Sequence, residues 1–187
     1  MWIMKTSSAF SKFVYRFILA TGMGAVISSC GTVPADYKST TPEFDMATFF
    51  NGELKAYGMV QNRSGKVIRR FDADLTGTWN GNEGILDEDF VYDDGETQKR
   101  IWKLKKLPDN NYTGTAGDVI GVATGQSAGY AFNWHYTLAI DVNGKTWNIN
   151  LDDWMYQLND SRIINRTIMT KWGFKVGEIT LIIEKLD

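Results

Sequence analysis

The sequence has 187 residues, of which 20 are basic and 22 acidic, so its formal net charge is −2. It contains no basic stripe of the kind that binds phosphate backbones, which argues against nucleic acid as a partner. The single cysteine and single histidine rule out a disulfide framework and a zinc ligand set, and we expect no metal ion and no cofactor.

Residues 1–29 have the features of a secretory signal peptide rather than of a membrane anchor. A basic segment precedes a short apolar core over residues 17–26, well below the roughly 18 to 20 apolar residues that span a bilayer. Small residues then lead to Cys30, an arrangement that resembles the bacterial lipoprotein signal. The resemblance implies that Cys30 is lipidated and becomes the mature N-terminus. The alternative is an ordinary cleaved signal followed by an incidental cysteine.

A lipid anchor on Cys30 predicts where the protein resides. Two or three acyl chains, at about 0.8 kcal/mol per buried CH₂, hold a protein on a membrane essentially permanently. The next residue is Gly31 and not Asp, which in Gram-negative lipoproteins implies sorting to the outer membrane. We therefore expect the protein in the cell envelope, anchored at the periplasmic face of the outer membrane.

Cleavage before Cys30 would leave 17 basic and 22 acidic residues, a net charge of −5. Residues 30–42 comprise the lipidated cysteine and a polar segment with two prolines, which predicts a flexible tether. Residues 43–187 are the size of one domain.

The domain begins with its only candidate helix, over residues 44–50, and continues with alternating polar and apolar residues separated by Gly or Asn turns. This period of two predicts strands. Residues 120–129, with three glycines, predict either a sharply bent strand or a mobile loop. The remaining strands are expected at residues 54–63, 66–79, 85–92, 97–107, 112–119, 163–172 and 178–186, and in the hairpin described next.

The clearest element is a hairpin over residues 130–154. Two alternating strands meet at Asn143-Gly144, a dipeptide typical of a two-residue hairpin turn. On the apolar face the turn predicts the pairs Ile140 with Trp147, Leu138 with Ile149, Tyr136 with Leu151, Trp134 with Asp153 and Phe132 with Met155. The opposite face is polar, and we expect it to meet water.

Nine or ten antiparallel strands with even spacing predict an all-β fold. Successive short hairpins leave two sheet edges that only closure removes, so we expect a single antiparallel meander β-barrel. A barrel of this size either fills itself with side chains or holds one small ligand.

Several segments resemble a known family: LTGTWNG, LDEDFVYDDGE, YTGTAGDVIGVATGQSAG, DDWMY and NRTIMTKWGFKVGEITL. Together they are similar to an uncharacterised family of bacterial lipoproteins that are taken to be lipocalin-like. The likeness spans residues 43–187. It implies a calycin-type barrel on a lipid anchor, and it implies no reaction.

Charged residues on apolar faces are the sharpest functional signal. A three-residue loop at residues 93–95 sets Glu88 across from Arg100, and an odd-length loop brings Asp118 beside Arg100. Buried charges must be paired, so we expect a cluster of these three inside the barrel. It is either a structural plug or the site at which Arg100 receives a carboxylate or phosphate head group.

Two further arginines, Arg69 and Arg166, stand among apolar neighbours, and Asp153 shares an apolar face from which it could meet either of them. Three inward arginines would outnumber the nearby acids. That count favours an anionic ligand.

Aromatic residues on the inward faces serve either as core or as the wall of a ligand site, and Trp102, Trp134 and Tyr136 are the candidates. His135 is predicted to lie opposite Asp152 on the polar face, which favours a surface pair over a catalytic dyad. A calcium site among the acids of residues 87–93 fails, because strand geometry points neighbouring side chains apart.

These observations favour a lipid-anchored barrel that binds a hydrophobic or amphipathic molecule such as a fatty acid, for example palmitate. The first alternative is a structural or envelope-assembly lipoprotein with a filled barrel and an unknown protein partner. The second is an enzyme that acts on a modified lipid, using His135 with Asp152 or Glu88 as acid or base.

Overall fold

The computed structural model describes residues 31–142 and 144–186. The predicted signal peptide and the lipidation site at Cys30 lie outside the described residues. Within them, no helix has the length and apolar character needed to cross a membrane.

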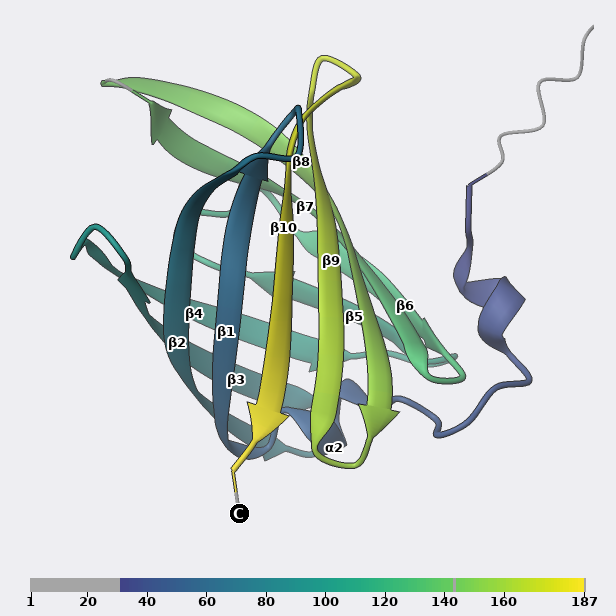
Figure 1. Cartoon of the computed structure of the whole chain (residues 1–187). Coiled ribbons are helices and arrows are strands. Elements are labelled where there is room, and N and C mark those ends of the chain that lie inside the picture. Colours follow the sequence, from purple (N-terminus) through teal and green to yellow (C-terminus); the bar gives the residue numbers. More distant parts are fainter. Residues whose placement is uncertain (1–30, 143, 187) are drawn as a thin grey trace, which may run out of the picture. The chain divides into compact units, whose positions relative to one another are not determined.

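Ten antiparallel strands follow one another around a closed barrel in chain order, and the last strand pairs with the first (Figure 1). This confirms the predicted all-β meander barrel. The strands are β1 (Gly52–Asn62), β2 (Val67–Asn80), β3 (Glu83–Tyr92), β4 (Thr97–Lys106), β5 (Asn111–Thr115), β6 (Ala123–Ala128), β7 (Ala131–Val142), β8 (Lys145–Asn159), β9 (Arg162–Lys171) and β10 (Phe174–Lys185).

The alternation of the sequence sets which side chains enter the barrel. Along β2, Phe71, Ala73 and Leu75 are buried, whereas Asp72 and Asp74 between them are exposed. All five predicted pairs of the central hairpin are found between β7 and β8. The registers predicted from turn chemistry are therefore confirmed.

A short helix, α2 (Met46–Phe49), forms within the predicted residues 44–50 and closes the end of the barrel at which β1 begins (Figure 1). Asp45 caps it by accepting a hydrogen bond from the Thr48 amide at 2.8 Å. The indole N–H of Trp79 donates to the Phe50 carbonyl at 3.1 Å. Gly77 makes this approach possible, because a Cβ there would lie 1.8 Å from the same carbonyl oxygen.

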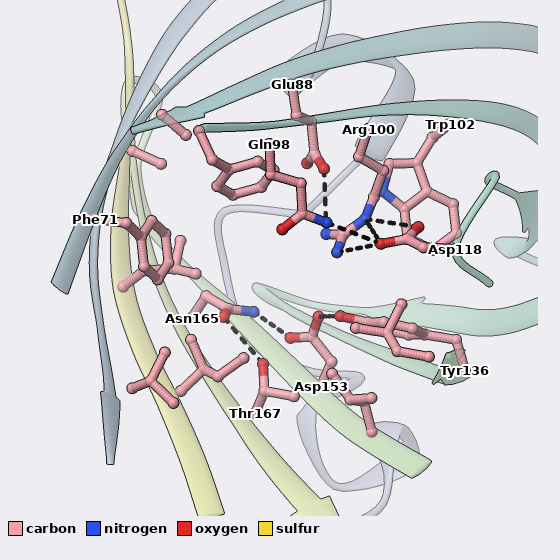
Figure 2. A pocket seen from close by; sticks show the side chains of 18 of the residues that line it. Phe71, Glu88, Gln98, Arg100, Trp102, Asp118, Tyr136, Asp153, Asn165 and Thr167 are labelled. Atoms are coloured by element: carbon pink, nitrogen blue, oxygen red, sulfur yellow. Dashed lines mark hydrogen bonds and ion pairs between the residues drawn. The ribbon is translucent and has the colours of Figure 1, made fainter. Parts of the chain in front are cut away.

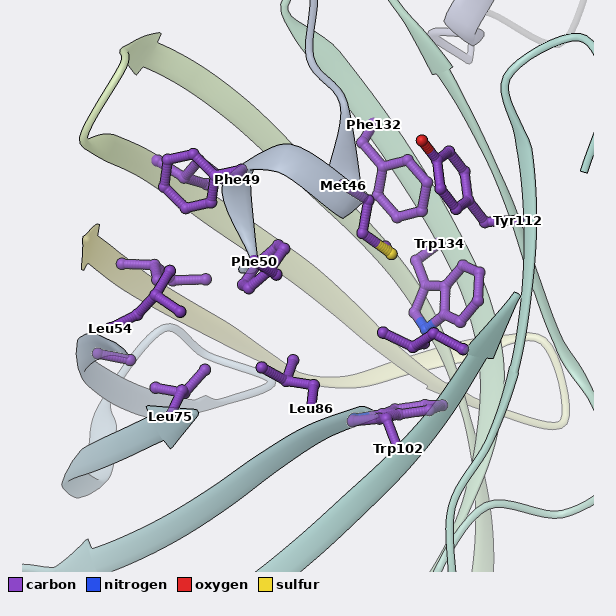
Figure 3. Close-up of a cluster of buried hydrophobic side chains, with 14 of the residues drawn as sticks. Met46, Phe49, Phe50, Leu54, Leu75, Leu86, Trp102, Tyr112, Phe132 and Trp134 are labelled. Carbon is purple, nitrogen blue, oxygen red and sulfur yellow. The ribbon is translucent and has the colours of Figure 1, made fainter. Parts of the chain in front are cut away.

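The α2 end of the barrel is filled with side chains (Figure 3). Apolar residues from α2 meet inward residues of the surrounding strands, and the labelled members are Met46, Phe49, Phe50, Leu54, Leu75, Leu86, Trp102, Tyr112, Phe132 and Trp134. The sequence left open whether the barrel is filled or hollow. This half is filled.

The described part of the predicted tether is held on the barrel. It contains a 3₁₀ turn, η1 (Pro34–Tyr37). The Tyr37 ring lies 5.3 Å from the ring of Tyr130 and 5.9 Å from that of Trp154. Thr40 Oγ1 also accepts a hydrogen bond from the Tyr130 amide at 3.2 Å. The ring contacts of Tyr37 attach this segment to the barrel. The composition of the segment does not reveal them.

The glycine-rich region divides into a loop and a strand. The strand expected over residues 112–119 ends at Thr115, and residues 116–122 form a loop before β6. This loop lies along β7: the Ile120 amide donates to the Thr137 carbonyl at 2.8 Å, and the Ala139 amide donates to the Asp118 carbonyl at 2.9 Å. Main-chain hydrogen bonds therefore fix the position of Asp118.

Candidate ligand-binding site

The half of the barrel away from α2 contains a cavity of about 540 Å³. Met46 and Phe50 of the filled half lie at its floor, and Arg69, Glu96 and Asp141 line it beside the hairpin turns at the other end of the barrel. The barrel is thus filled in one half and hollow in the other.

The cavity has two unlike walls. Inward residues of β10, β1 and β2 make one wall apolar, with Ile179, Leu181, Ile183, Ala56, Val60, Phe71 and Ala73. Strands β3, β4, β7, β8 and β9, together with the loop before β6 that contains Asp118, place polar side chains on the other wall. These form two groups on two sides of the pocket (Figure 2). We call them the arginine cluster (Glu88, Gln98, Arg100, Asp118) and the aspartate cluster (Tyr136, Asp153, Asn165, Thr167).

In the arginine cluster, Glu88 and Arg100 are register partners on β3 and β4, as predicted. The Arg100 guanidinium donates from Nε to Asp118 at 2.9 Å and from Nη2 at 2.8 Å. Its Nη1 lies 3.5 Å from Glu88. Gln98 donates to Asp118 at 3.2 Å. The sequence thus predicted all three charged members of this cluster.

Burial disfavours the charged form of both Glu88 and Arg100, and the outcome differs between them. It raises the pKa of Glu88 to about 7, although the Arg100 guanidinium and the Trp102 indole N–H favour the ionised form. For Arg100, burial opposes the charge, but Glu88 and Asp118 outweigh it and raise its pKa above the usual value. Glu88 is therefore ready to gain or lose a proton near neutral pH.

The aspartate cluster surrounds a carboxyl that is 5% exposed. Asp153 accepts hydrogen bonds from the Asn165 amide and, at 3.3 Å, from the Tyr136 hydroxyl. Burial raises the pKa of Asp153 to about 6, against the opposing effect of these donors and of Thr167. Among the described residues, no Lys, Arg or His forms an ion pair with Asp153.

Asn165 and Thr167 were missed because the two faces of β9 were assigned the wrong way round. The aliphatic residues Ile164 and Ile168 indicated an inward face that includes Arg166. The structure instead buries Asn165 and Thr167, each 2% exposed. Counting back from the turn does not settle the faces either, because Asn159 pairs with Arg162 and a β-bulge between Gln157 and Asn159 then shifts the register so that Asp153 lies across from Thr167.

The inward position predicted for Arg166 is therefore wrong. Its side chain points outward, is 59% exposed, and pairs with Glu178 at 2.6 Å. Arg69 lies at the cavity mouth, where it contacts the Tyr92 ring and pairs with Asp94 and Glu96 at 3.0 and 2.6 Å. Neither arginine meets Asp153.

These positions reverse the predicted charge balance. The described residues that line the cavity include five carboxyl groups, from Glu88, Glu96, Asp118, Asp141 and Asp153, but only two guanidinium groups, from Arg69 and Arg100. The premise for an anionic ligand, an excess of inward arginines, fails.

The aromatic candidates belong both to the core and to the cavity wall. Trp102 and Trp134 are 6% and 3% exposed, and their rings meet edge to face at 5.8 Å. Tyr136 meets Trp102 in the same way at 5.4 Å. All three also line the cavity, so the filled half forms its floor.

The His135–Asp152 pair lies on the outer surface, as predicted. Nδ1 of His135 is 3.6 Å from Asp152, and the two side chains are about half exposed. The pair faces away from the cavity. Among the residues that the structure describes, no group of three His, Cys, Asp or Glu side chains is placed to hold a metal ion.

Comparison with known proteins identifies the family. A family model described as "Protein of unknown function (DUF3833)" matches residues 24–185. The chain belongs to this family. Among curated proteins, none shows significant sequence similarity to this family member.

Comparison with solved structures gives matches of very low sequence identity. The S-type phycobiliprotein lyase CPES from Guillardia theta matches with a TM-score of 0.53 and 7% identity, over 76% of this chain and 92% of the lyase. A de novo designed fluorescence-activating β-barrel matches with a TM-score of 0.43 and 8% identity, over 76% and 99% of the two chains. A redesigned barrel bound to DFHBI, mFAP1, has a TM-score of 0.41 and 10% identity, over 74% and 97%. At these identities the lyase match supports the barrel fold alone.

Proposed function

We propose that this protein binds an amphipathic small molecule inside its barrel. The observation that carries the proposal is a cavity of about 540 Å³ with one apolar wall and one polar wall. Small-molecule pockets commonly measure about 300 to 1,000 Å³ and combine apolar lining with a few convergent polar groups. The apolar body of the ligand would lie against β10, β1 and β2, and its polar group would face the two clusters.

The polar clusters favour binding over the structural alternative. A plug that only holds strand register needs paired charges, whereas Asp153 is buried without a cationic partner among the described residues. Glu88 and Asp153 both have raised pKa values beside empty space, and buried ionisable groups with perturbed pKa values concentrate at functional sites.

We further propose that the protein works at the membrane from which such a ligand would come. The lipoprotein-type sequence before Cys30 supports attachment through acyl chains, and Gly31 supports the outer membrane and its periplasmic face as the location. Metabolic labelling with a palmitate analogue tests the anchor. Wild-type protein should incorporate the label and the Cys30→Ser variant should not, and equal labelling of both would exclude this site.

Ligand binding is tested by extracting untagged protein purified from its native envelope and identifying what it carries by mass spectrometry. Ala73 lines the cavity and is 1% exposed, so Ala73→Leu would reduce the space for a ligand. Thr76→Leu, on the outer face of the same strand, is the matched control. We expect one compound from wild type and control and much less from Ala73→Leu. Equal recovery from all three, or no bound compound together with no change in melting temperature on adding amphipathic molecules, would contradict the proposal.

A further inference from the structure

The charge distribution of the cavity points to the kind of polar group that the ligand carries. We propose that this group is a cationic nitrogen, such as a protonated amine, held by the aspartate cluster. The inference rests on the proposed function, because it assumes that an amphipathic molecule occupies the cavity. It replaces the carboxylate head group that the sequence favoured.

The first argument is the uncompensated carboxyl of Asp153. Its carboxylate accepts hydrogen bonds from Asn165 and Tyr136 and interacts with the Thr167 hydroxyl, and all three are neutral donors. A carboxylate has about four lone-pair sites, so it can accept further donors. Buried charges are ordinarily paired, and among the described residues no ion pair to Asp153 exists. A ligand ammonium group would supply the missing charge.

The second argument is that Arg100 is already occupied. Its Nε and Nη2 donate to Asp118, and its Nη1 faces Glu88. An anionic head group would have to displace Asp118, whose own carbonyl is hydrogen-bonded to the β7 main chain. It would then lie beside Glu88 as well, and carboxylates held close together repel each other.

The third argument is the balance of charged groups over the whole cavity lining. Five carboxyl groups and two guanidinium groups line it, and both guanidinium groups are paired with acids. Clefts lined by an excess of one sign of charge concentrate ligands of the opposite sign. The mouth and the interior therefore both favour a cation over an anion.

The apolar wall defines the rest of the ligand. Leu181, Ile179 and Phe71 line the side away from the polar clusters, and Met155 and Met169 extend the apolar lining. Methionine side chains adapt to ligands of different shape. The ligand class is therefore an apolar body that ends in one amine.

A series with one common alkyl chain tests the head group alone. Decylamine, decanol and decanoate are titrated by calorimetry at pH 7.5 into the full chain carrying Cys30→Ser, which has no acyl acceptor. We expect decylamine to bind at least about tenfold more tightly than decanol, and decanoate to bind most weakly.

Two variants test which residues cause the preference for one head group over another. Asp153→Asn, which keeps the shape of the side chain, should weaken decylamine binding by about tenfold and leave decanol binding nearly unchanged. Asp118→Asn frees Arg100 and should strengthen decanoate binding. Asp72→Asn removes an exposed charge from the outer face of β2 and should change nothing. If Asp153→Asn does not fold, Glu88→Gln removes a charge from the arginine cluster of the same cavity.

The outcomes separate the inference from the proposed function. Tightest binding of decanoate or decanol, or an Asp153→Asn variant that folds and binds decylamine as wild type does, would overturn the cationic ligand and leave the binding function in place. Failure of all three compounds to bind would overturn both.

Discussion

Replacing Arg100 with methionine measures how strongly the arginine cluster depends on its one positive charge. Arg100 is only 14% exposed on its side chain, and it contacts both Glu88 and Asp118. Removing one partner of a buried ion pair leaves an uncompensated charge, at a typical cost of about 3 to 5 kcal/mol. Because the cluster lines a cavity and not the packed core, we expect a loss near the lower end, about 3 kcal/mol of the free energy of unfolding at pH 8.

The loss should depend on pH. Burial already raises the pKa of Glu88 to about 7, and without the Arg100 guanidinium it rises further. At pH 5.5 Glu88 in the variant is therefore protonated, so less charge is left uncompensated. We expect the difference between wild type and Arg100→Met to shrink clearly between pH 8 and pH 5.5.

Urea unfolding followed by tryptophan fluorescence provides the measurement. Lys99→Met is the matched control, because Lys99 neighbours Arg100 on β4 and pairs with Asp87 and Asp89 on the exposed face. Exposed ion pairs contribute little, so this control should change stability far less. An Arg100→Met variant no less stable than Lys99→Met, or a loss that does not vary with pH, would refute the reasoning.

Three further predictions concern the fold and its titration. The folded-state pKa values of Glu88 and Asp153, about 7 and about 6, lie above their ordinary values of 4.5 and 3.8, so the folded protein binds more protons than the unfolded chain across roughly pH 4 to 7. These two groups therefore lower the free energy of unfolding as pH rises through that window, and urea unfolding of Asp153→Asn between pH 4 and pH 8 should show a smaller fall than wild type. Gly77→Ala should destabilise the protein by about 1 to 3 kcal/mol in the same assay, because the new Cβ would collide with the Phe50 carbonyl, and unchanged stability would contradict that contact. Tyr37→Ala should release the segment before α2, so limited proteolysis should cut it faster than in wild type while the barrel stays intact.

The sequence predicted those parts of the molecule in which turn chemistry fixes the pairing. Two-residue and three-residue hairpin loops set the β7–β8 and β3–β4 registers, and with them the Glu88–Arg100 pair. The faces of β9 were not predicted, because aliphatic residues occur on both of them. Ile163 is fully buried, whereas Ile164 is 39% exposed. Patterns of hydrophobicity decide a strand face only where one face is clearly polar.

The barrel is filled near α2 and hollow further along its axis. A local pattern of polar and apolar residues does not report how far along the axis a residue lies. On β3 and β4, Leu86 pairs with Trp102 in the filled half, and the next inward pair toward the mouth is Glu88 with Arg100. On β8 the inward residue after Met155 in that direction is Asp153. On β9, Ile163 is followed by Asn165.

Four strands therefore change from apolar to polar at neighbouring inward positions. The change coincides with the point at which the interior stops being filled, since Leu86 and Trp102 form its floor and Glu88 and Arg100 line it. Aliphatic side chains packed tightly against these charges would remove their remaining contact with water, at a large cost in free energy. The opposite wall, on β10, β1 and β2, stays apolar through the same heights. The polar inward residues thus keep the cavity from being filled, and the apolar wall across from them faces the cavity. An amphipathic cation would contact both walls, its apolar body on one and its charged group on the other.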